Sequence, residues 1–175
     1  MTTTTKPPPP RPPTPSKRVA VRKPTHIPPT VLLTAVEKFG KTTLAAHAPS
    51  PLILMAKGET GYDTLLSTGQ VPAIPAAVCD DWNELVQWQT SLINDPQGIQ
   101  TLVTDAQGGF EALCASMVCE RDFKGDWGEA GFAAFGRGTK LVAQEWRGYL
   151  MRIEQLRDKH GVQHIILGHS KIKLF

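Results

Sequence analysis

A lysine and a threonine that follow a short apolar run are the residues of this chain best suited to phosphate chemistry. The stretch from Ala35 to Thr42 reads AVEKFGKT, the spacing of a phosphate-binding (Walker A) loop, except that alanine replaces the first glycine. In such a loop, backbone N–H groups and the positive end of a helix dipole surround an anion, and Gly40 lets the backbone approach it closely. Lys41 would then reach the β- and γ-phosphates, and the Thr42 hydroxyl would bind Mg²⁺. The alternative is an accidental GKT after a core strand.

The loop and the start of the helix after it supply the predicted nucleotide ligands. They are Ala35, Val36, Glu37, Lys38, Phe39, Gly40, Lys41, Thr42 and Thr43. The apolar run 31–35 before the loop is typical of a central strand buried on both faces, and 41–47 is expected to be a short helix. Alanine at position 35 is tolerated if that residue keeps a negative φ angle.

An aspartate ends another apolar run, residues 101–105. A carboxylate at a strand end, about 60 residues beyond the phosphate loop, suits the Walker B position, which orders Mg²⁺ through water. The alternative for Asp105 is a helix N-cap or a loop residue. Ala106 follows, so no adjacent glutamate is available to activate water. This favours a RecA-like domain, in which the base lies elsewhere, over the AAA+ subclass.

Two further side chains could act on the γ-phosphate. Glu59 follows the second apolar run and is the candidate for polarising the attacking water, although Lys57 occupies the place where an acid is first expected. Otherwise Glu59 is a solvated loop charge or pairs with Lys57. His169, at the end of the last apolar run, is either a sensor of the γ-phosphate or an ordinary strand-end residue. Glu37 is a poorer candidate base, expected to point to solvent.

Strand and helix patterns alternate along the chain, which predicts a mainly parallel sheet with helices on both faces. Strands are expected at 31–35, 52–56, 101–105 and 164–167, with a shorter one within 73–78, and helices at 41–47, from Asp81 onward, at 110–120 and at 139–159. Asp81 and Glu84 have the spacing of a capping box. The expected fold class is therefore an α/β, three-layer P-loop core of the RecA-like kind, spanning residues 31–175. Its sheet is expected to be truncated after the fourth strong strand.

Taken together, these segments resemble the phage-encoded RecA-like ATP-binding proteins of the AAA domain group, related to phage single-strand-annealing and recombination ATPases. The resemblance covers residues 31–173 and is carried by VLLTAVEKFGKTTLAAHAPSPLILMAKGETG, TLVTDAQGGFEALC, RDFKGDWGEAGFAAFGRG, and QEWRGYL followed by IILGHSKIK. It implies a RecA-like fold, ATP and Mg²⁺ binding, and a role in phage DNA metabolism. A homo-oligomeric ATPase that uses single-stranded DNA as a partner would fit this resemblance.

Two other functions remain open from the sequence. The chain could be a module that holds ATP for assembly or structure and hydrolyses it slowly or not at all, because the identity of the base is unsettled. A small-molecule or nucleotide kinase is the weaker alternative, because the chain shows no arginine-rich lid.

The net charge of +3 is the sum of two unlike parts. Residues 1–30 carry +6 and hold 10 of the 15 prolines, a composition typical of a disordered or polyproline II tail. Such a tail could solubilise or tether the chain, hold nucleic acid weakly, or dock to a proline-binding partner. The remaining residues carry −3, so the basic whole-chain charge does not by itself indicate nucleic-acid binding.

Residues 121–137 mix basic, acidic and aromatic side chains and are expected to form most of a loop over 122–138. Rings and cations of this kind can hold single-stranded DNA, but the acids cancel much of the charge, so packing against the core is the favoured alternative. The three cysteines form no CxxC pair and fit free buried thiols in a reducing cytoplasm. No apolar run is long enough for a membrane span, so a cytoplasmic location is expected.

Overall fold

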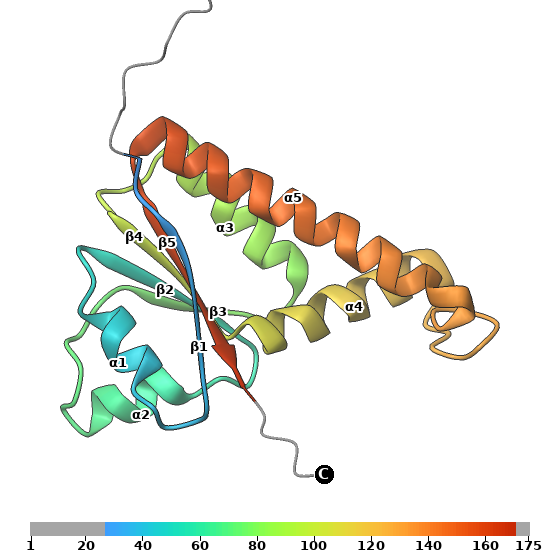
Figure 1. Cartoon of the computed structure of the whole chain (residues 1–175), viewed down its shortest axis with the longest axis horizontal. Helices are drawn as coiled ribbons and strands as arrows, with labels where there is room; N and C mark the ends of the chain where they lie inside the picture. Colours follow the sequence, from blue (N-terminus) through green and yellow to red (C-terminus); the bar gives the residue numbers. More distant parts are fainter. Residues whose placement is uncertain (1–26, 171–175) are drawn as a thin grey trace, which may run out of the picture.

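The computed structural model describes residues 27–170, and these residues build a five-stranded sheet in which every strand pair is parallel. The strand order is β1-β5-β4-β2-β3, so the chain returns to insert β4 and β5 between its first two strands (Figure 1). The strands are β1 (Thr30–Ala35), β2 (Pro51–Ala56), β3 (Ala76–Cys79), β4 (Thr101–Asp105) and β5 (Gln163–His169). The expected parallel sheet is confirmed. Most of the predicted tail lies outside the described residues.

Helices cover both faces of the sheet and complete three layers. The helices are α1 (Lys41–Ala46), α2 (Gly61–Ser67), α3 (Trp82–Asn94), α4 (Gln107–Phe123) and α5 (Arg137–His160). The first two bury a smaller apolar cluster against one face, which includes Ala45, Tyr62 and Leu167. The other three bury the larger cluster, centred on Trp82, Phe110 and their neighbours, against the opposite face. This is the expected α/β P-loop core architecture.

Strand β1 differs from the expectation. The sequence predicts a central strand buried on both faces, but β1 is an edge strand, and Val31 and Leu32 are 41% and 56% exposed. Within the described part of the chain, β1 pairs with β5 alone. The prediction was wrong because an apolar run indicates a tendency to be buried but not the lateral position of a strand. That position depends on the crossovers between distant segments.

Most of the remaining elements lie close to their predicted ranges. Helix α3 begins after Asp81, whose Oδ1 accepts a hydrogen bond from the Glu84 N–H at 2.9 Å, as the capping-box spacing predicts. The return bond differs, because the Glu84 carboxylate accepts from the N–H of Asp80 rather than that of Asp81. Helix α2 was not predicted. Its sequence GYDTLLS is short, and Tyr62 is its only buried residue.

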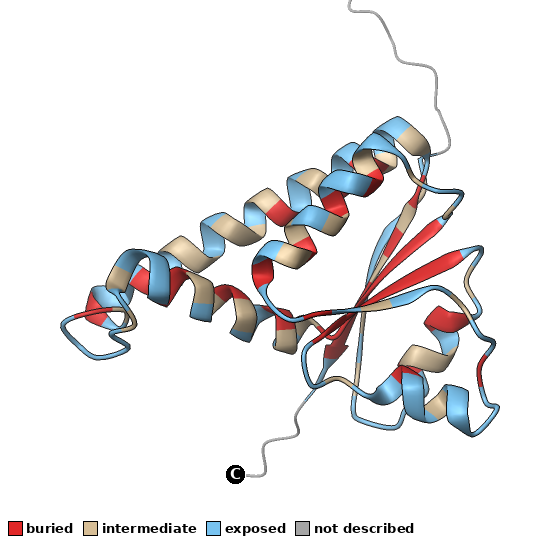
Figure 2. Cartoon of the chain, turned by 180° about the vertical axis from the view of Figure 1, so that it is seen from behind, coloured by how far each residue is buried: buried red, intermediate tan, exposed pale blue. Residues whose placement is uncertain are grey.

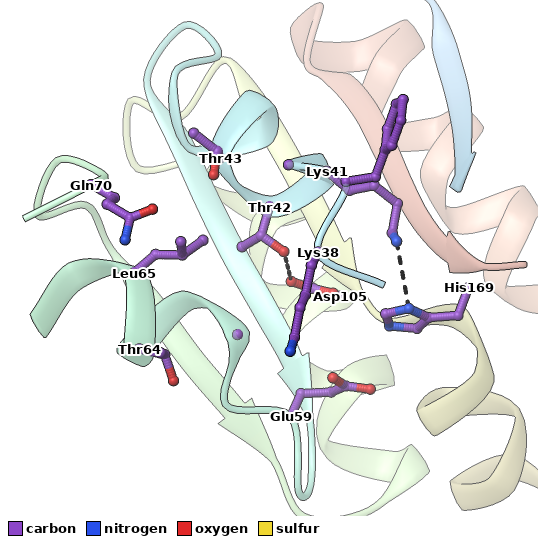
Figure 3. A pocket seen from close by; sticks show the side chains of 13 residues that line it. Lys38, Lys41, Thr42, Thr43, Glu59, Thr64, Leu65, Gln70, Asp105 and His169 are labelled. Carbon is purple, nitrogen blue, oxygen red and sulfur yellow. Dashed lines mark hydrogen bonds between the residues drawn. The ribbon is translucent and has the colours of Figure 1, made fainter. Parts of the chain in front are cut away.

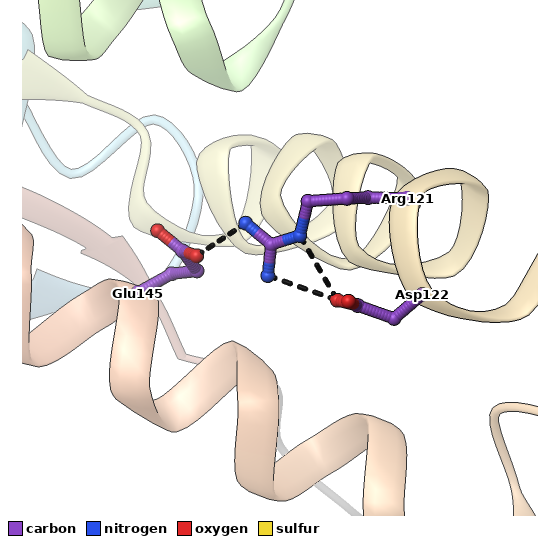
Figure 4. Close-up of polar contacts among 3 residues, drawn as sticks. All are labelled: Arg121, Asp122 and Glu145. Atoms are coloured by element: carbon purple, nitrogen blue, oxygen red, sulfur yellow. Dashed lines mark hydrogen bonds and ion pairs between the residues drawn. The ribbon is translucent and has the colours of Figure 1, made fainter.

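Helices α4 and α5 form a hairpin that extends away from the sheet, and both are longer than predicted (Figure 1). The exposed outer sides of this hairpin and its buried inner stripe are visible in Figure 2. Arg121 of α4 joins the two helices, since its Nη1 lies 2.7 Å from the Glu145 carboxylate of α5 and its Nη2 lies 2.9 Å from Asp122 (Figure 4). Gly161, with φ of 70°, ends α5 as expected.

All three cysteines are buried and free, as predicted, and burial raises the pKa of Cys79 and Cys114 to about 12. Among the described residues, none of the helices has the length and apolar character that bilayer crossing requires.

Candidate functional site

A cavity of about 470 Å³ opens where the carboxyl ends of the parallel strands meet (Figure 3). Because parallel strands end on the same side of a sheet, residues far apart in the chain converge there. The lining residues come from the loop after β1 and the start of α1, from the turn after β2 and from helix α2, and from the last residues of β4 and β5. They are Lys38, Phe39, Gly40, Lys41, Thr42, Thr43, Glu59, Gly61, Thr64, Leu65, Gln70, Asp105 and His169.

The loop between β1 and α1 is curled rather than extended. Lys38 and Gly40 both have left-handed backbone conformations, with φ of 63° and 85°. Glycine adopts this conformation without strain, and at Gly40 it turns the chain directly into α1, which begins at Lys41. Ala35 is the last residue of β1 and is absent from the residues with positive φ, so its methyl group is accommodated. The N–H groups at the start of α1 therefore border the cavity.

The Lys41 ammonium is buried and tied to the loop. Its Nζ donates to the carbonyl oxygens of Ala35 and Val36, both at 2.9 Å, and lies 3.5 Å from His169 Nδ1. An ammonium group has three protons, and these three acceptors satisfy them. A bound phosphate would replace some of these contacts with a charge-assisted hydrogen bond, which is stronger than a bond to a neutral carbonyl.

Thr42 and Asp105 meet across the cavity floor. The Thr42 hydroxyl donates to Asp105 Oδ2 at 2.9 Å, and the aspartate is buried at the end of β4. Burial raises the pKa of the Asp105 carboxyl, while the Thr42 hydrogen bond and the charges of His169 and Lys41 oppose the rise. A hydroxyl and a carboxylate oxygen side by side are hard ligands of the kind that Mg²⁺ selects, so the donor set fits a magnesium ion.

Glu59 is brought into the cavity by a tight turn after β2. Its N–H donates to the Ala56 carbonyl at 3.0 Å, and Gly58 within the turn has φ of 90°. Lys57 points elsewhere and pairs with Asp80 at 3.1 Å, so the alternative pairing of Glu59 with Lys57 is not what the structure has. Burial raises the pKa of Glu59, and the charge of Asp105 adds to the rise.

His169 completes the charged end of the cavity. One ligand atom from each of Glu59, Asp105 and His169 lies within 4.8 Å of the others. Because the Lys41 ammonium can only donate, a hydrogen bond in this contact requires His169 Nδ1 to be the acceptor, and the ring proton of a neutral His169 would then reside on Nε2. That tautomer gives His169 a donor and no lone pair on Nε2, so it suits contact with a phosphate oxygen better than metal ligation.

A family model described as an AAA domain matches residues 27–175. The chain belongs to this AAA domain family. The comparison with curated proteins returned no match. With the parallel sheet and the loop geometry, family membership makes the chain a nucleotide-binding P-loop domain of the ATPase type.

Not all predicted nucleotide ligands line the cavity of the AAA domain. Ala35 and Val36 contribute the carbonyl oxygens that hold Lys41, and the exposed Glu37 borders a neighbouring hollow that is also lined by Gln107 and His169. The other predicted ligands, Lys38 to Thr43 and His169, do line it.

Sequence reasoning missed one wall of the AAA domain's cavity. Thr64 and Leu65 of α2, and Gln70 just beyond it, lie on the side away from Glu59 and His169 (Figure 3). The sequence carried no signal for them, because α2 itself was not recognised and its approach to α1 is a tertiary contact. With them, the cavity extends well beyond the charged end formed by Glu59, Asp105 and His169.

The aromatic residues at the end of the α4–α5 hairpin pack against one another. Phe132 lies 5.7 Å from Phe123 and 4.8 Å from Trp127 between ring centroids, and the Arg137 guanidinium lies 5.6 Å from the centre of the Phe123 ring. They form a cluster of their own at the hairpin end, so the favoured expectation of packing against the core was wrong. Phe135 stays outside the cluster and is 97% exposed.

Proposed function

We propose that this chain is a Mg²⁺-dependent ATPase whose reaction takes place at the charged end of the cavity. The observation that carries the proposal is the convergence of Glu59, Asp105 and His169 within 4.8 Å, beside the Thr42 hydroxyl and the Lys41 ammonium. These groups come from four strand ends and match the parts that phosphoryl transfer to water needs: charge neutralisation, a metal ligand, a base and a donor to the transferred γ-phosphate.

Each side chain has one role in this proposal. Lys41 binds the β- and γ-phosphate oxygens and neutralises their charge. Thr42 and Asp105 would hold the magnesium ion, which would supply additional neutralisation of phosphate charge. Glu59 accepts the proton of the attacking water, for which a raised pKa is favourable because it brings the base closer to the working pH. His169 donates its Nε2 proton to a γ-phosphate oxygen.

The wall formed by α2 supports a nucleoside as part of the ligand. A triphosphate held by the loop would leave the space beside Leu65 and Gln70 for the sugar and base, with an apolar surface for stacking and an amide for hydrogen bonding. We take ATP as the nucleotide.

Single-stranded DNA and a role in phage-type recombination or annealing form the finer part of the proposal. They are supported by the resemblance of the sequence and by the end of the α4–α5 hairpin, where Phe135 is almost fully exposed and Trp127 is half exposed. Arg137 and Lys140 lie two and five positions after Phe135 in the chain, and exposed rings beside cations hold single strands through stacking and phosphate contacts. A homo-oligomer is proposed on the resemblance alone.

Phosphate release from ATP, with and without Mg²⁺ and single-stranded DNA, tests the proposal. We expect Glu59→Gln to lower turnover by about 10²- to 10⁴-fold, the range for loss of a general base, and to leave ATP affinity nearly unchanged. Asp63→Asn, an exposed acid of α2 outside the cavity lining, is the matched control. If the wild-type chain binds ATP tightly but releases no phosphate under any of these conditions, the alternative of an ATP-binding module is correct.

A further inference from the structure

The first turn of α4 lies unusually close to the end of β2. A Cβ atom added to Gly109 would stand 2.6 Å from the Cβ of Ala56, a separation that real Cβ atoms essentially never show. The constraint comes from space alone, because Gly109 is helical and has no positive φ. The preceding glycine differs, since a Cβ added to Gly108 would meet no atom within 4 Å. Only one of the two adjacent glycines is therefore required by packing.

This contact lies directly against the turn that carries Glu59. The carbonyl of Ala56 accepts the hydrogen bond from the Glu59 N–H at 3.0 Å, and this bond closes the turn. The same added Cβ on Gly109 would lie 3.6 Å from Glu59 Oε1. Gly109 thus faces both the base of the turn and the carboxylate that the turn presents.

The same turn of α4 is also joined to Asp105. Helix α4 begins two residues after it, and the N–H groups of Gly109 and Phe110 both donate to the carbonyl of Ala106. A shift of this first turn would move the connection to Asp105, whereas a shift of the β2 turn would move Glu59. In either case the spacing of the two carboxylates would change. Because the interior is closely packed, a methyl group added at Gly109 would have to move either the first turn of α4 or the β2 turn.

We propose that Gly109 is a positioning residue: its missing side chain lets α4 brace the β2 turn, and this contact sets the Glu59 carboxylate beside Asp105. The inference rests on the proposed function for its effect on turnover. Glu59 acts on water only if its carboxylate is held within hydrogen-bonding reach of the attack position, and a misplacement of 1 Å costs roughly 10²-fold in rate.

Three variants of the full chain test the inference: Gly109→Ala, Gly108→Ala as the matched control, and the double variant Gly109→Ala with Ala56→Gly. We expect Gly109→Ala to lower kcat by at least about 10-fold. ATP affinity should stay within roughly twofold of wild type, because the phosphate loop and the α2 wall bind the nucleotide. Gly108→Ala should turn over ATP like wild type. The double variant moves the methyl group from one side of the contact to the other, so it should recover most of the lost kcat.

Thermal unfolding and ATP titration of each variant separate positioning from mere packing. If Gly109→Ala retains wild-type kcat, or loses ATP binding and kcat together, the inference is overturned; it is also overturned if the folded double variant does not recover. Should Gly109→Ala fail to fold, Ala56→Gly alone removes the contact without a clash. A lowered kcat with unchanged ATP affinity then supports the inference, and an unchanged kcat overturns it.

A wild-type chain without any turnover would refute the proposed ATPase and leave the positioning question to crystal structures. Comparison of wild type with Gly109→Ala, or with Ala56→Gly if the former does not fold, then decides it. A changed separation between the Glu59 and Asp105 carboxylates supports the positioning role, and an unchanged separation overturns it.

Discussion

Two histidines occupy the same strand, β5, in opposite surroundings. His164, near its start, is buried under α5, where its Nε2 lies 2.9 Å from the Thr104 hydroxyl and 3.0 Å from the Tyr149 hydroxyl. His169, at its end, lies on the other face, in the cavity beside Lys41. The neighbouring strand β4 is divided in the same way, because consecutive side chains of a strand point to opposite faces: Thr104 joins the buried network and Asp105 the cavity.

The buried network and the cavity differ in how the charges and hydrogen bonds of their polar side chains are balanced. In the buried network the two hydroxyls and the ring nitrogen all lie within hydrogen-bonding distance of one another, and each can remain uncharged. In the cavity, two carboxylates lie close together and both have raised pKa values, because burial disfavours both charges and the charge of Asp105 further raises the pKa of Glu59. The buried network links helix α5 to the sheet through Tyr149, although His164 Nδ1 has no hydrogen-bond partner among the described residues. An arrangement under electrostatic strain is one that a cationic or hydrogen-bonding ligand stabilises.

The largest expected effect falls on ligand binding. Lys41→Ala should weaken ATP binding by about 100-fold or more, because it removes charge-assisted hydrogen bonds worth roughly 1.5–3 kcal/mol each. Titration with ATP and Mg²⁺ measures the loss. Lys57→Ala, which removes an exposed ammonium paired with Asp80 outside the cavity, should bind ATP like wild type. Equal losses in the two variants would mean that binding depends on overall charge and not on this cavity.

The second effect concerns pH and the buried histidine. Burial lowers the pKa of His164 from 6.5 to about 3, so the folded state resists protonation that the unfolded chain accepts. The stabilisation is fully present above pH 6.5 and is lost as the pH falls toward 3. For one such group, the free energy of unfolding drops by about 2 kcal/mol between pH 7 and pH 5.

His164→Gln isolates this contribution, because other groups titrate equally in both proteins. Urea unfolding of wild type and variant at pH 7 and pH 5 should show the steeper loss in wild type. The slope of the variant should match that of wild type only if His164 titrates normally in the folded protein, which would contradict the effect of its burial.

The fold was predictable to the extent that its determinants are local. Alternating strand and helix patterns indicated a parallel sheet with helices on both faces, and four strands lie close to their predicted ranges. The edge position of β1 was not predictable, because it depends on where β5 inserts. Helix α2 was missed because seven residues with one buried side chain give no helical periodicity.

The residues of the candidate site were likewise predictable only where the signal is local in the sequence. Lys41 and Thr42 were found from a contiguous motif, and Asp105 from its place at a strand end. The sequence did not single out Glu59 as the base, because the amino-acid composition does not indicate that the turn at Gly58 brings it back to the cavity. Gln70 and Gly109 gave no signal at all, since their importance comes from contacts between segments that only the folded chain brings together.

The smallest expected effect is on the free energy of unfolding. Substitutions at two adjacent residues of β4 should change it in opposite directions. Asp105→Asn removes a buried carboxylate that its surroundings disfavour, yet keeps an acceptor for the Thr42 hydroxyl. It should raise the free energy of unfolding by about 1 kcal/mol at pH 7 and abolish the Mg²⁺ dependence of ATP binding. Thr104→Val keeps the side-chain volume and removes the hydroxyl that lies within hydrogen-bonding distance of both Tyr149 and His164.

Thr104→Val should therefore lower the free energy of unfolding by about 1–2 kcal/mol and leave ATP binding unchanged. Denaturant unfolding without nucleotide, paired with ATP titration, measures both quantities for both variants. Destabilisation of similar size by Asp105→Asn would show that the carboxylate is a structural group, and the contrast between the two sides of the sheet would then fail. Opposite signs from neighbouring residues would mean that the cavity keeps Asp105 at a cost in stability, as a ligand-binding group requires.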